Sequence, residues 1–90
     1  MLNSFSLTMI NQPNTVSYPA QFTKQDDGTY RISFRDVPEA VTHCDDINDA
    51  VVAASYVLRI AFEHYREYVK QIPAPSPVQP GEVLVSIKRP

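Results

Sequence analysis

The sequence has few of the residues that disulfides, phosphate-binding loops and membrane spans require. Its single cysteine, Cys44, excludes an internal disulfide and favours a reducing compartment. Its two glycines, Gly28 and Gly81, are too few for a loop that cradles a phosphate. The first residues lack the basic start of a secretory signal, and no apolar run is long enough to cross a membrane. We therefore expect a cytoplasmic protein without a membrane segment.

Length and charge restrict the function further. A chain of 90 residues forms one small domain, which buries only about 60% of its unfolded surface and often needs a partner or a second copy for stability. A formal net charge of −2 gives nucleic acid little long-range attraction and mildly favours a basic protein partner. These numbers favour a binding domain that self-associates, and symmetry makes a dimer the first expectation.

A β-hairpin dominates the first half of the sequence. Apolar and polar residues alternate over residues 16–23 and again over residues 30–35, which predicts two half-buried strands. Asp27-Gly28 between them marks a tight turn, because both residue types tolerate positive φ. Pro19 has no N–H group to donate, so we expect that side of the first strand to face an edge or a bulge.

A long amphipathic helix is predicted in the second half. Apolar residues recur at spacings of three and four along residues 47–68, and Asp46 suits the N-cap position. The predicted core-facing stripe consists of Ile47, Ala50, Val51, Ala54, Val57, Leu58, Ala61, Tyr65 and Tyr68. Val52, Tyr56 and Ile60 lie off this stripe, so the outer face of the helix is not uniformly polar.

The remaining segments complete an α+β fold. Residues 40–44 suit a short third strand, and residues 83–88 alternate as a last strand. The proline-rich residues 73–80 end the helix and form a stiff, extended spacer. Residues 1–15 suit either a flexible leader or a short edge strand. The expected fold is a small antiparallel sheet of three to four strands with one helix packed across it, in the order β-β-β-α-β.

The polar residues show no catalytic arrangement. Acids in the hairpin turn and at the helix start are explained by turn and cap chemistry, whereas a metal nuclease needs several carboxylates that converge on cations. His43, Cys44 and Asp45 are neighbours on a predicted strand and point to alternate faces, so they cannot all bind one metal ion. A nucleophilic Cys44 lacks any local signature, and His64 suits a surface position. We expect no catalytic residue, no metal and no cofactor.

Several short motifs, taken in order, resemble the HicB family of type II antitoxins. They are Tyr18-Pro19-Ala20, Asp27-Gly28-Thr29-Tyr30, the stretch from Ser33 to Thr42, the acid-capped helix and the stretch from Ile72 to Pro77. Each motif is common by itself, but the ordered set with similar spacings is fairly specific. The resemblance extends from about Val16 to the last strand.

This resemblance implies a function. The N-terminal domain of the family is similar to a partial RNase H fold without catalytic activity. It binds a small basic HicA-type toxin, an mRNA interferase with a double-stranded-RNA-binding-like fold, and masks its active surface. Residues 16–90 would then form the toxin-binding domain, with the spacer 73–80 inside it, and self-association would be common.

Two departures from the family pattern are visible. Many members have a glycine-cysteine pair and a further glycine where this chain has Glu39, Ala40 and Cys44. Many members also carry a C-terminal DNA-binding domain, which is not recognisable in this sequence, so we expect no direct DNA binding from this chain.

Charged residues around the hairpin are the expected partner contacts. We predict that they lie in or near the toxin interface: Asp26, Asp27, Arg35, Asp36 and Glu39. Two alternatives remain. The chain could be a stand-alone phage or mobile-element protein that uses the same scaffold to bind a different host protein, or a nuclease built on the RNase H-like scaffold.

Overall fold

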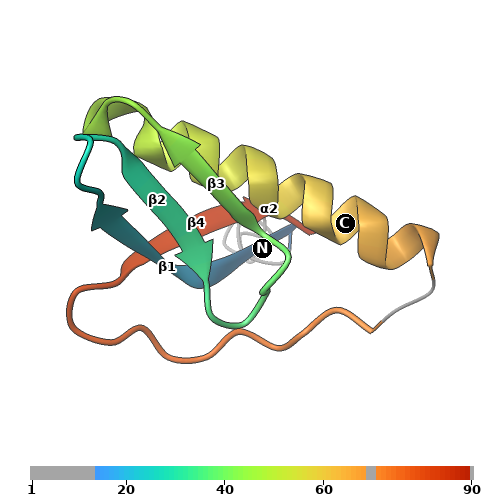
Figure 1. Ribbon diagram of the computed structural model, residues 1–90. Coiled ribbons are helices and arrows are strands. Elements are labelled where there is room, and N and C mark those ends of the chain that lie inside the picture. Colours follow the sequence, from blue (N-terminus) through green and yellow to red (C-terminus); the bar gives the residue numbers. More distant parts are fainter. Residues whose placement is uncertain (1–13, 69–70, 90) are drawn as a thin grey trace, which may run out of the picture.

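A four-stranded sheet lies under one long helix in the computed structural model, which describes residues 14–68 and 71–89 (Figure 1). The strands are β1 (Thr15–Lys24), β2 (Tyr30–Phe34), β3 (Val41–Cys44) and β4 (Val83–Lys88). A 3-10 turn, η2 (Ile47–Asp49), leads into helix α2 (Ala50–Glu67). All neighbouring strands are antiparallel, in the spatial order β3-β2-β1-β4. The predicted α+β fold and its element order are confirmed.

The structure describes only the end of the N-terminal segment for which a prediction was made. The proposed leader or edge strand over residues 1–15 lies outside the described residues, apart from Asn14 and Thr15, and Thr15 opens β1. The backbone N–H of Arg89 donates to the carbonyl of Asn14 at 2.8 Å. This bond places the start of β1 beside the end of β4.

The β1–β2 turn contains the predicted Asp27-Gly28 pair inside a longer loop. Lys24 pairs with Tyr30, so the loop spans residues 25–29. Gly28 has φ of 90°, a left-handed conformation that an L side chain rarely adopts. The Asp27 carboxylate accepts hydrogen bonds from the backbone N–H of Thr29 at 3.0 Å and from its hydroxyl at 2.7 Å. The side chain of Asp27 therefore stabilises the loop that sets the hairpin register.

Pro19 lies in the middle of β1 without breaking the sheet. It pairs with Leu84 of β4, whereas pairing between β1 and β2 begins only at Ala20. At Pro19 the strand has a neighbour on one side only, which is the edge position predicted for a residue without an N–H group.

The core forms between α2 and one face of the sheet. Tyr18, Ile32, Phe34 and Val85 from the strands are fully buried, as are several small alanines of α2. The rings of Tyr18 and Phe62 meet edge to face with centroids 5.3 Å apart. The small residues of α2 leave room between the helix and the sheet. The large side chains of the strands fill this room, so the two layers pack closely.

Part of the predicted helix stripe was wrong. Val51 is 54% exposed, Ile47 is 44% exposed and Tyr68 is 61% exposed, whereas Phe62, which the stripe omitted, is 1% exposed. Phe62 follows Leu58 by four residues and precedes Tyr65 by three, so it shares their face. Ile47 lies in η2 and Tyr68 follows the end of α2, so the 3.6-residue period does not reach them.

Candidate functional site

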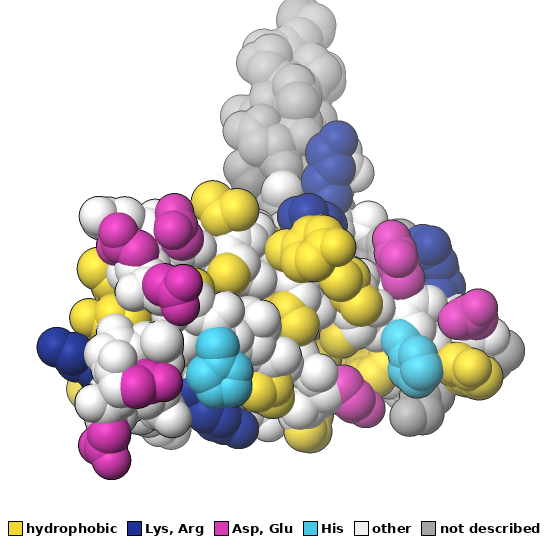
Figure 2. Space-filling model, turned by 45° about the horizontal axis from the view of Figure 1, so that its top comes forward, with side chains coloured by type: hydrophobic (Ala, Val, Ile, Leu, Met, Phe, Trp, Pro, Cys, Tyr) yellow, Lys and Arg dark blue, Asp and Glu magenta, His cyan; other side chains and the backbone are white. Residues whose placement is uncertain are grey.

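Strand pairing gathers acidic residues from two distant segments at one end of the molecule. Tyr30, just after the β1–β2 turn, pairs with Cys44 at the end of β3. The acids that follow Cys44 therefore emerge beside the acids of the turn, and Figure 2 shows Asp and Glu side chains collected at this end. We call this group the acidic end: Asp26, Asp27, Asp45, Asp46 and Asp49. It holds half of the 10 acidic residues in the chain.

The residues of the acidic end are exposed, and their carboxylates differ in whether they accept hydrogen bonds within the fold. Hydrogen bonds from Thr29 lower the pKa of Asp27 below its usual value. Asp46 caps η2 by accepting from the backbone N–H of Asn48 at 2.9 Å. Within residues 14–68 and 71–89, no hydrogen bond or ion pair engages the carboxylates of Asp26, Asp45 and Asp49. These three charges remain available to a partner.

The other predicted contact residues lie at the opposite end of β2. Thr29 and Arg35 are separated by the length of β2, about 20 Å at about 3.3 Å per residue. The structure therefore does not bring Arg35, Asp36 and Glu39 together with Asp26 and Asp27. All five of these positions are partly or fully exposed.

Arg35 anchors the chain that returns from α2 to β4, which we call the return segment (residues 71–82). Its guanidinium donates to the Glu82 carboxylate at 2.7 and 3.0 Å and to the Pro77 carbonyl at 2.6 Å. The hydrogen bonds between Arg35 and Glu82 raise the pKa of Arg35 and lower that of Glu82. Arg35 thus closes one end of the return segment against the exit of β2.

Asp36 and Glu39 are also engaged within the fold. The Asp36 carboxylate accepts from the backbone N–H and the hydroxyl of Ser76, both at 2.7 Å. The Tyr65 hydroxyl donates to Glu39, and burial together with this bond raises the pKa of Tyr65 to about 12. These two carboxylates hold the return segment and the end of α2 against the loop after β2.

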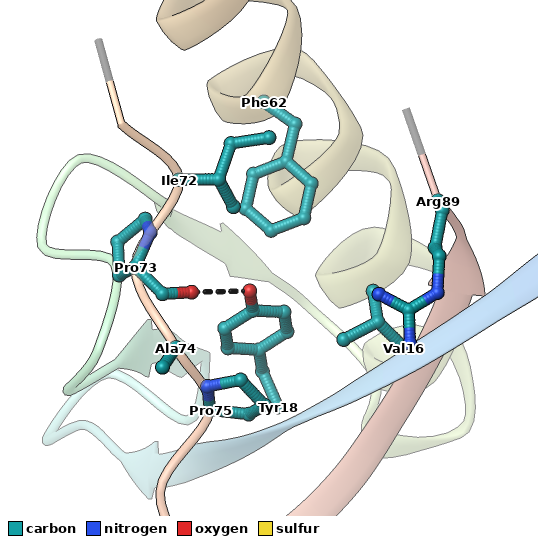
Figure 3. Close-up of a pocket in the computed structure, with 8 residues that line it drawn as sticks. All are labelled: Val16, Tyr18, Phe62, Ile72, Pro73, Ala74, Pro75 and Arg89. Carbon is teal, nitrogen blue, oxygen red and sulfur yellow. Dashed lines mark hydrogen bonds between the residues drawn. The ribbon is translucent and has the colours of Figure 1, made fainter.

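A hollow of about 360 Å³ lies between the return segment, β1 and α2. Figure 3 shows the Tyr18 ring under Phe62, with its hydroxyl donating to the Pro73 carbonyl. The lining residues are Val16, Tyr18, Phe62, Ile72, Pro73, Ala74, Pro75 and Arg89. The polar side chains of this wall are those of Tyr18, whose hydroxyl is engaged by Pro73, and Arg89.

The described part of the chain was also searched for metal and membrane sites. There, no three side chains of His, Cys, Asp or Glu lie together as metal ligands would. Nor is any helix in these ranges both long and apolar enough to span a bilayer. Cys44 is half-buried, and its thiol donates to the carbonyl of Asp46 at 3.3 Å.

Comparison with known proteins identifies the family. A protein-family model described as "HicB_like antitoxin of bacterial toxin-antitoxin system" matches residues 17–88. The chain belongs to this family of HicB-like antitoxins. The resemblance inferred from the ordered motifs is thereby confirmed.

Curated HicB antitoxins are similar over most of this chain. Antitoxin HicB of Escherichia coli strain K12 is 36% identical over 70 residues, which is 78% of this chain and 51% of that protein. Antitoxin HicB 1 of Photorhabdus laumondii is 41% identical over 61 residues, which is 68% of this chain and 39% of that protein. The chain matches about half of these relatives' length or less.

A solved structure supports the same fold. The crystal structure of the N-terminal domain of Burkholderia pseudomallei antitoxin HicB superimposes with a TM-score of 0.63 at 18% identity. The match covers 80% of this chain and 95% of that domain. The sheet and helix described above are therefore the fold of a HicB N-terminal domain.

Sequence reasoning missed three members of the acidic end. It assigned Asp45, Asp46 and Asp49 to helix capping and did not join them to the hairpin turn. Only Asp46 makes a side-chain capping bond, since Asp49 at the N-cap of α2 makes none. The pairing of the second and third strands, followed to its end, would have placed all five acids together.

Proposed function

We propose that this chain binds and masks a small basic HicA-type mRNA interferase, and that the acidic end is the first contact. The observation that supports the proposal is the gathering of five exposed acids at one end of a HicB-family domain, three of which have no side-chain partner among the residues that the structure describes. The proposed role is binding, with no chemistry performed by the chain itself.

Electrostatics explains why this end suits a basic partner. The net charge of the chain is only −2, so the five acids at one end create a local field much stronger than the net charge implies. Such a field steers a basic protein toward one orientation and speeds association. Exposed charges change the association rate and its salt dependence more than they change affinity.

The predicted contacts divide into two groups under this proposal. Asp26 and Asp27 belong to the acidic end and would meet the toxin directly. Arg35, Asp36 and Glu39 stay predicted contacts, but they also hold the return segment and α2. Substitutions at these three positions would change folding together with binding, so they are poor probes of the interface.

Co-expression tests the proposal. The chain is expressed with a HicA-type toxin, taken from beside its gene if a short basic reading frame lies there, and we expect it to restore growth and to block RNA cleavage by the purified toxin. Failure to restore growth would instead favour a stand-alone interaction protein with another target. RNA cleavage by the purified chain with a divalent metal would support the nuclease alternative.

Charge reversal locates the interface. Asp26→Lys and Asp45→Lys each change an exposed carboxylate that has no partner in the described fold, and each is expected to slow toxin association severalfold. Glu67→Lys is the matched control, because it makes the same charge change about 25 Å away at the other end of α2. Equal effects of all three changes in a kinetic binding assay would contradict the placement at the acidic end.

A further inference from the structure

Half of the basic residues in the chain line one hollow between α2 and β4. The hollow has a volume of about 180 Å³, and the buried Phe62 and Ile87 form its apolar floor. We call it the basic hollow, and its charged residues are Arg59, Glu63, Arg66, Lys88 and Arg89. Four of these are cations, from a total of 8 Lys and Arg residues. The basic hollow lies far from the acidic end, because Lys88 pairs with Thr15 and the acidic turn follows Lys24 at the other end of β1.

The fold leaves most of these cations without a counter-charge. Within residues 14–68 and 71–89 the ion pairs involve Arg35, and no hydrogen bond engages the side chain of Arg59, Arg66 or Lys88. The Arg59 guanidinium lies 6.0 Å from the centre of the Tyr56 ring, and Glu63 brings one negative charge to the wall. Cations held together in this way repel one another, so an anion that enters the hollow is attracted.

The basic hollow adjoins the hollow of about 360 Å³ under the return segment, which we call the Tyr18 hollow. Phe62 and Arg89 line both of them. In Figure 3 the Arg89 side chain lies beside Val16, across the Tyr18 hollow from Ile72 and Pro73. The two hollows therefore form one groove with an apolar part and a cationic part. Small-molecule sites commonly have this character, with volumes of about 300–1,000 Å³, mostly apolar walls and a few polar groups that fix the ligand.

We propose that this groove binds a small organic acid with an aliphatic body. The aliphatic chain lies in the Tyr18 hollow against Val16 and Ile72, and the carboxylate meets Arg66, Lys88 and Arg89 in the basic hollow. A guanidinium donates two parallel hydrogen bonds to a carboxylate, so arginines suit this head group. The groove is separate from the acidic end, and the inference does not depend on the proposed toxin.

A nucleic-acid strand fits the groove less well than a small acid. Proteins that bind single strands present aromatic rings on which the bases stack. The rings of Tyr18 and Phe62 are each 1% exposed, so the core occupies their faces. An aliphatic chain needs only apolar contact, which the half-buried Val16 and Ile72 offer at the surface of the groove.

Calorimetric titration of the chain with three probes tests the proposal. Decanoate carries the aliphatic chain and the charge, decanol carries the chain alone, and acetate carries the charge alone. We expect decanoate to bind at one site, and decanol and acetate to bind at least about tenfold more weakly, because each lacks one part of the interaction. No saturable binding of decanoate, or equal binding of decanol or acetate, would overturn the proposal. Binding of a single-stranded RNA oligonucleotide in place of decanoate would also overturn it.

Charge removal locates the carboxylate. Arg66→Gln and Lys88→Gln should each weaken decanoate binding severalfold, because each removes a cation from the basic hollow. Lys24→Gln is the matched control, since it removes an exposed cation at the other end of β1. An equal loss of affinity in all three variants would overturn this placement.

A substitution in the return segment locates the aliphatic chain. Ala74→Asp places a negative charge in the wall of the Tyr18 hollow and should weaken decanoate binding by about tenfold or more. Val78→Asp is the control, because Val78 is 44% exposed elsewhere on the same segment. Circular dichroism verifies that both variants fold. Unchanged decanoate affinity in a folded Ala74→Asp variant would overturn the role of the Tyr18 hollow.

Discussion

Tyr65 illustrates how one side chain links α2 to the loop after β2. Its hydroxyl donates a hydrogen bond to Glu39. Burial is the larger cause and this bond the second cause of a rise in the Tyr65 pKa from 10.0 to about 12. A raised pKa in the folded state means that the neutral hydroxyl stabilises the fold. That contribution is complete below pH 10 and is lost as the pH rises toward about 12.

The alkaline stability of the chain should therefore depend on Tyr65. We expect the free energy of unfolding of the wild type to fall more steeply between pH 10 and about 12 than that of Tyr65→Phe. Urea denaturation at a series of pH values measures this difference, and tyrosinate absorbance follows the ionisation. Tyr18, whose pKa is also raised, remains in both proteins. Parallel pH profiles would show that burial and the bond to Glu39 together do not raise the pKa of Tyr65.

The observed core of α2 differs from the predicted one at Phe62, which is buried, and at Tyr68, which is exposed. Phe62 is 1% exposed and contacts Tyr18, so Phe62→Ala should destabilise the fold by about 3–5 kcal/mol. Tyr68 is 61% exposed, so Tyr68→Ala should change stability by no more than about 0.5 kcal/mol. Chemical denaturation measures both values. Similar losses of stability for the two variants would support the predicted core-facing stripe, which includes Tyr68 and omits Phe62.

Among the elements, the return segment depends most on contacts from elsewhere in the chain. Residues 71–79 belong to no helix or strand. Tyr18 and Arg35 nevertheless donate hydrogen bonds to backbone carbonyls of this segment, and Asp36 accepts from the backbone N–H and the hydroxyl of Ser76. Figure 1 shows it passing along the sheet before it enters β4. Its course is fixed by these bonds and by the stiffness that proline gives it.

Removing the Asp36 carboxylate should loosen this segment. Asp36→Ala leaves the Ser76 N–H and hydroxyl without their acceptor, so we expect a loss of about 1–3 kcal/mol in the free energy of unfolding. Hydrogen exchange at the Ser76 amide should quicken at the same time. Asp26→Ala removes an exposed acid that has no partner in the described part of the chain and should cost less than about 0.5 kcal/mol. Unchanged exchange at Ser76 would rule out this role for Asp36.

On the scale of the whole molecule, the proposed toxin contact lies at one end only. The acidic end lies at the start of α2, and Glu67 lies about 25 Å along it. Added salt should slow toxin association with the wild type and with Glu67→Lys by screening the acidic end, and should slow association with Asp45→Lys less. A kinetic binding assay at a series of salt concentrations measures these slopes. Equal salt dependence for the wild type and Asp45→Lys would contradict a contact at the acidic end.

Local patterns in the sequence determined most of the fold. Alternation predicted the strands, the spacing of three and four predicted α2, and Asp27-Gly28 predicted the turn, because each depends on neighbours within a few residues. The ordered motifs were enough to indicate the HicB family. Only the tertiary structure decided which acids share one end, since that depends on the pairing of Tyr30 with Cys44. It alone also showed that Arg35 and Asp36 bind a segment some 40 residues later, because loop closure between distant residues leaves no periodic signal in sequence.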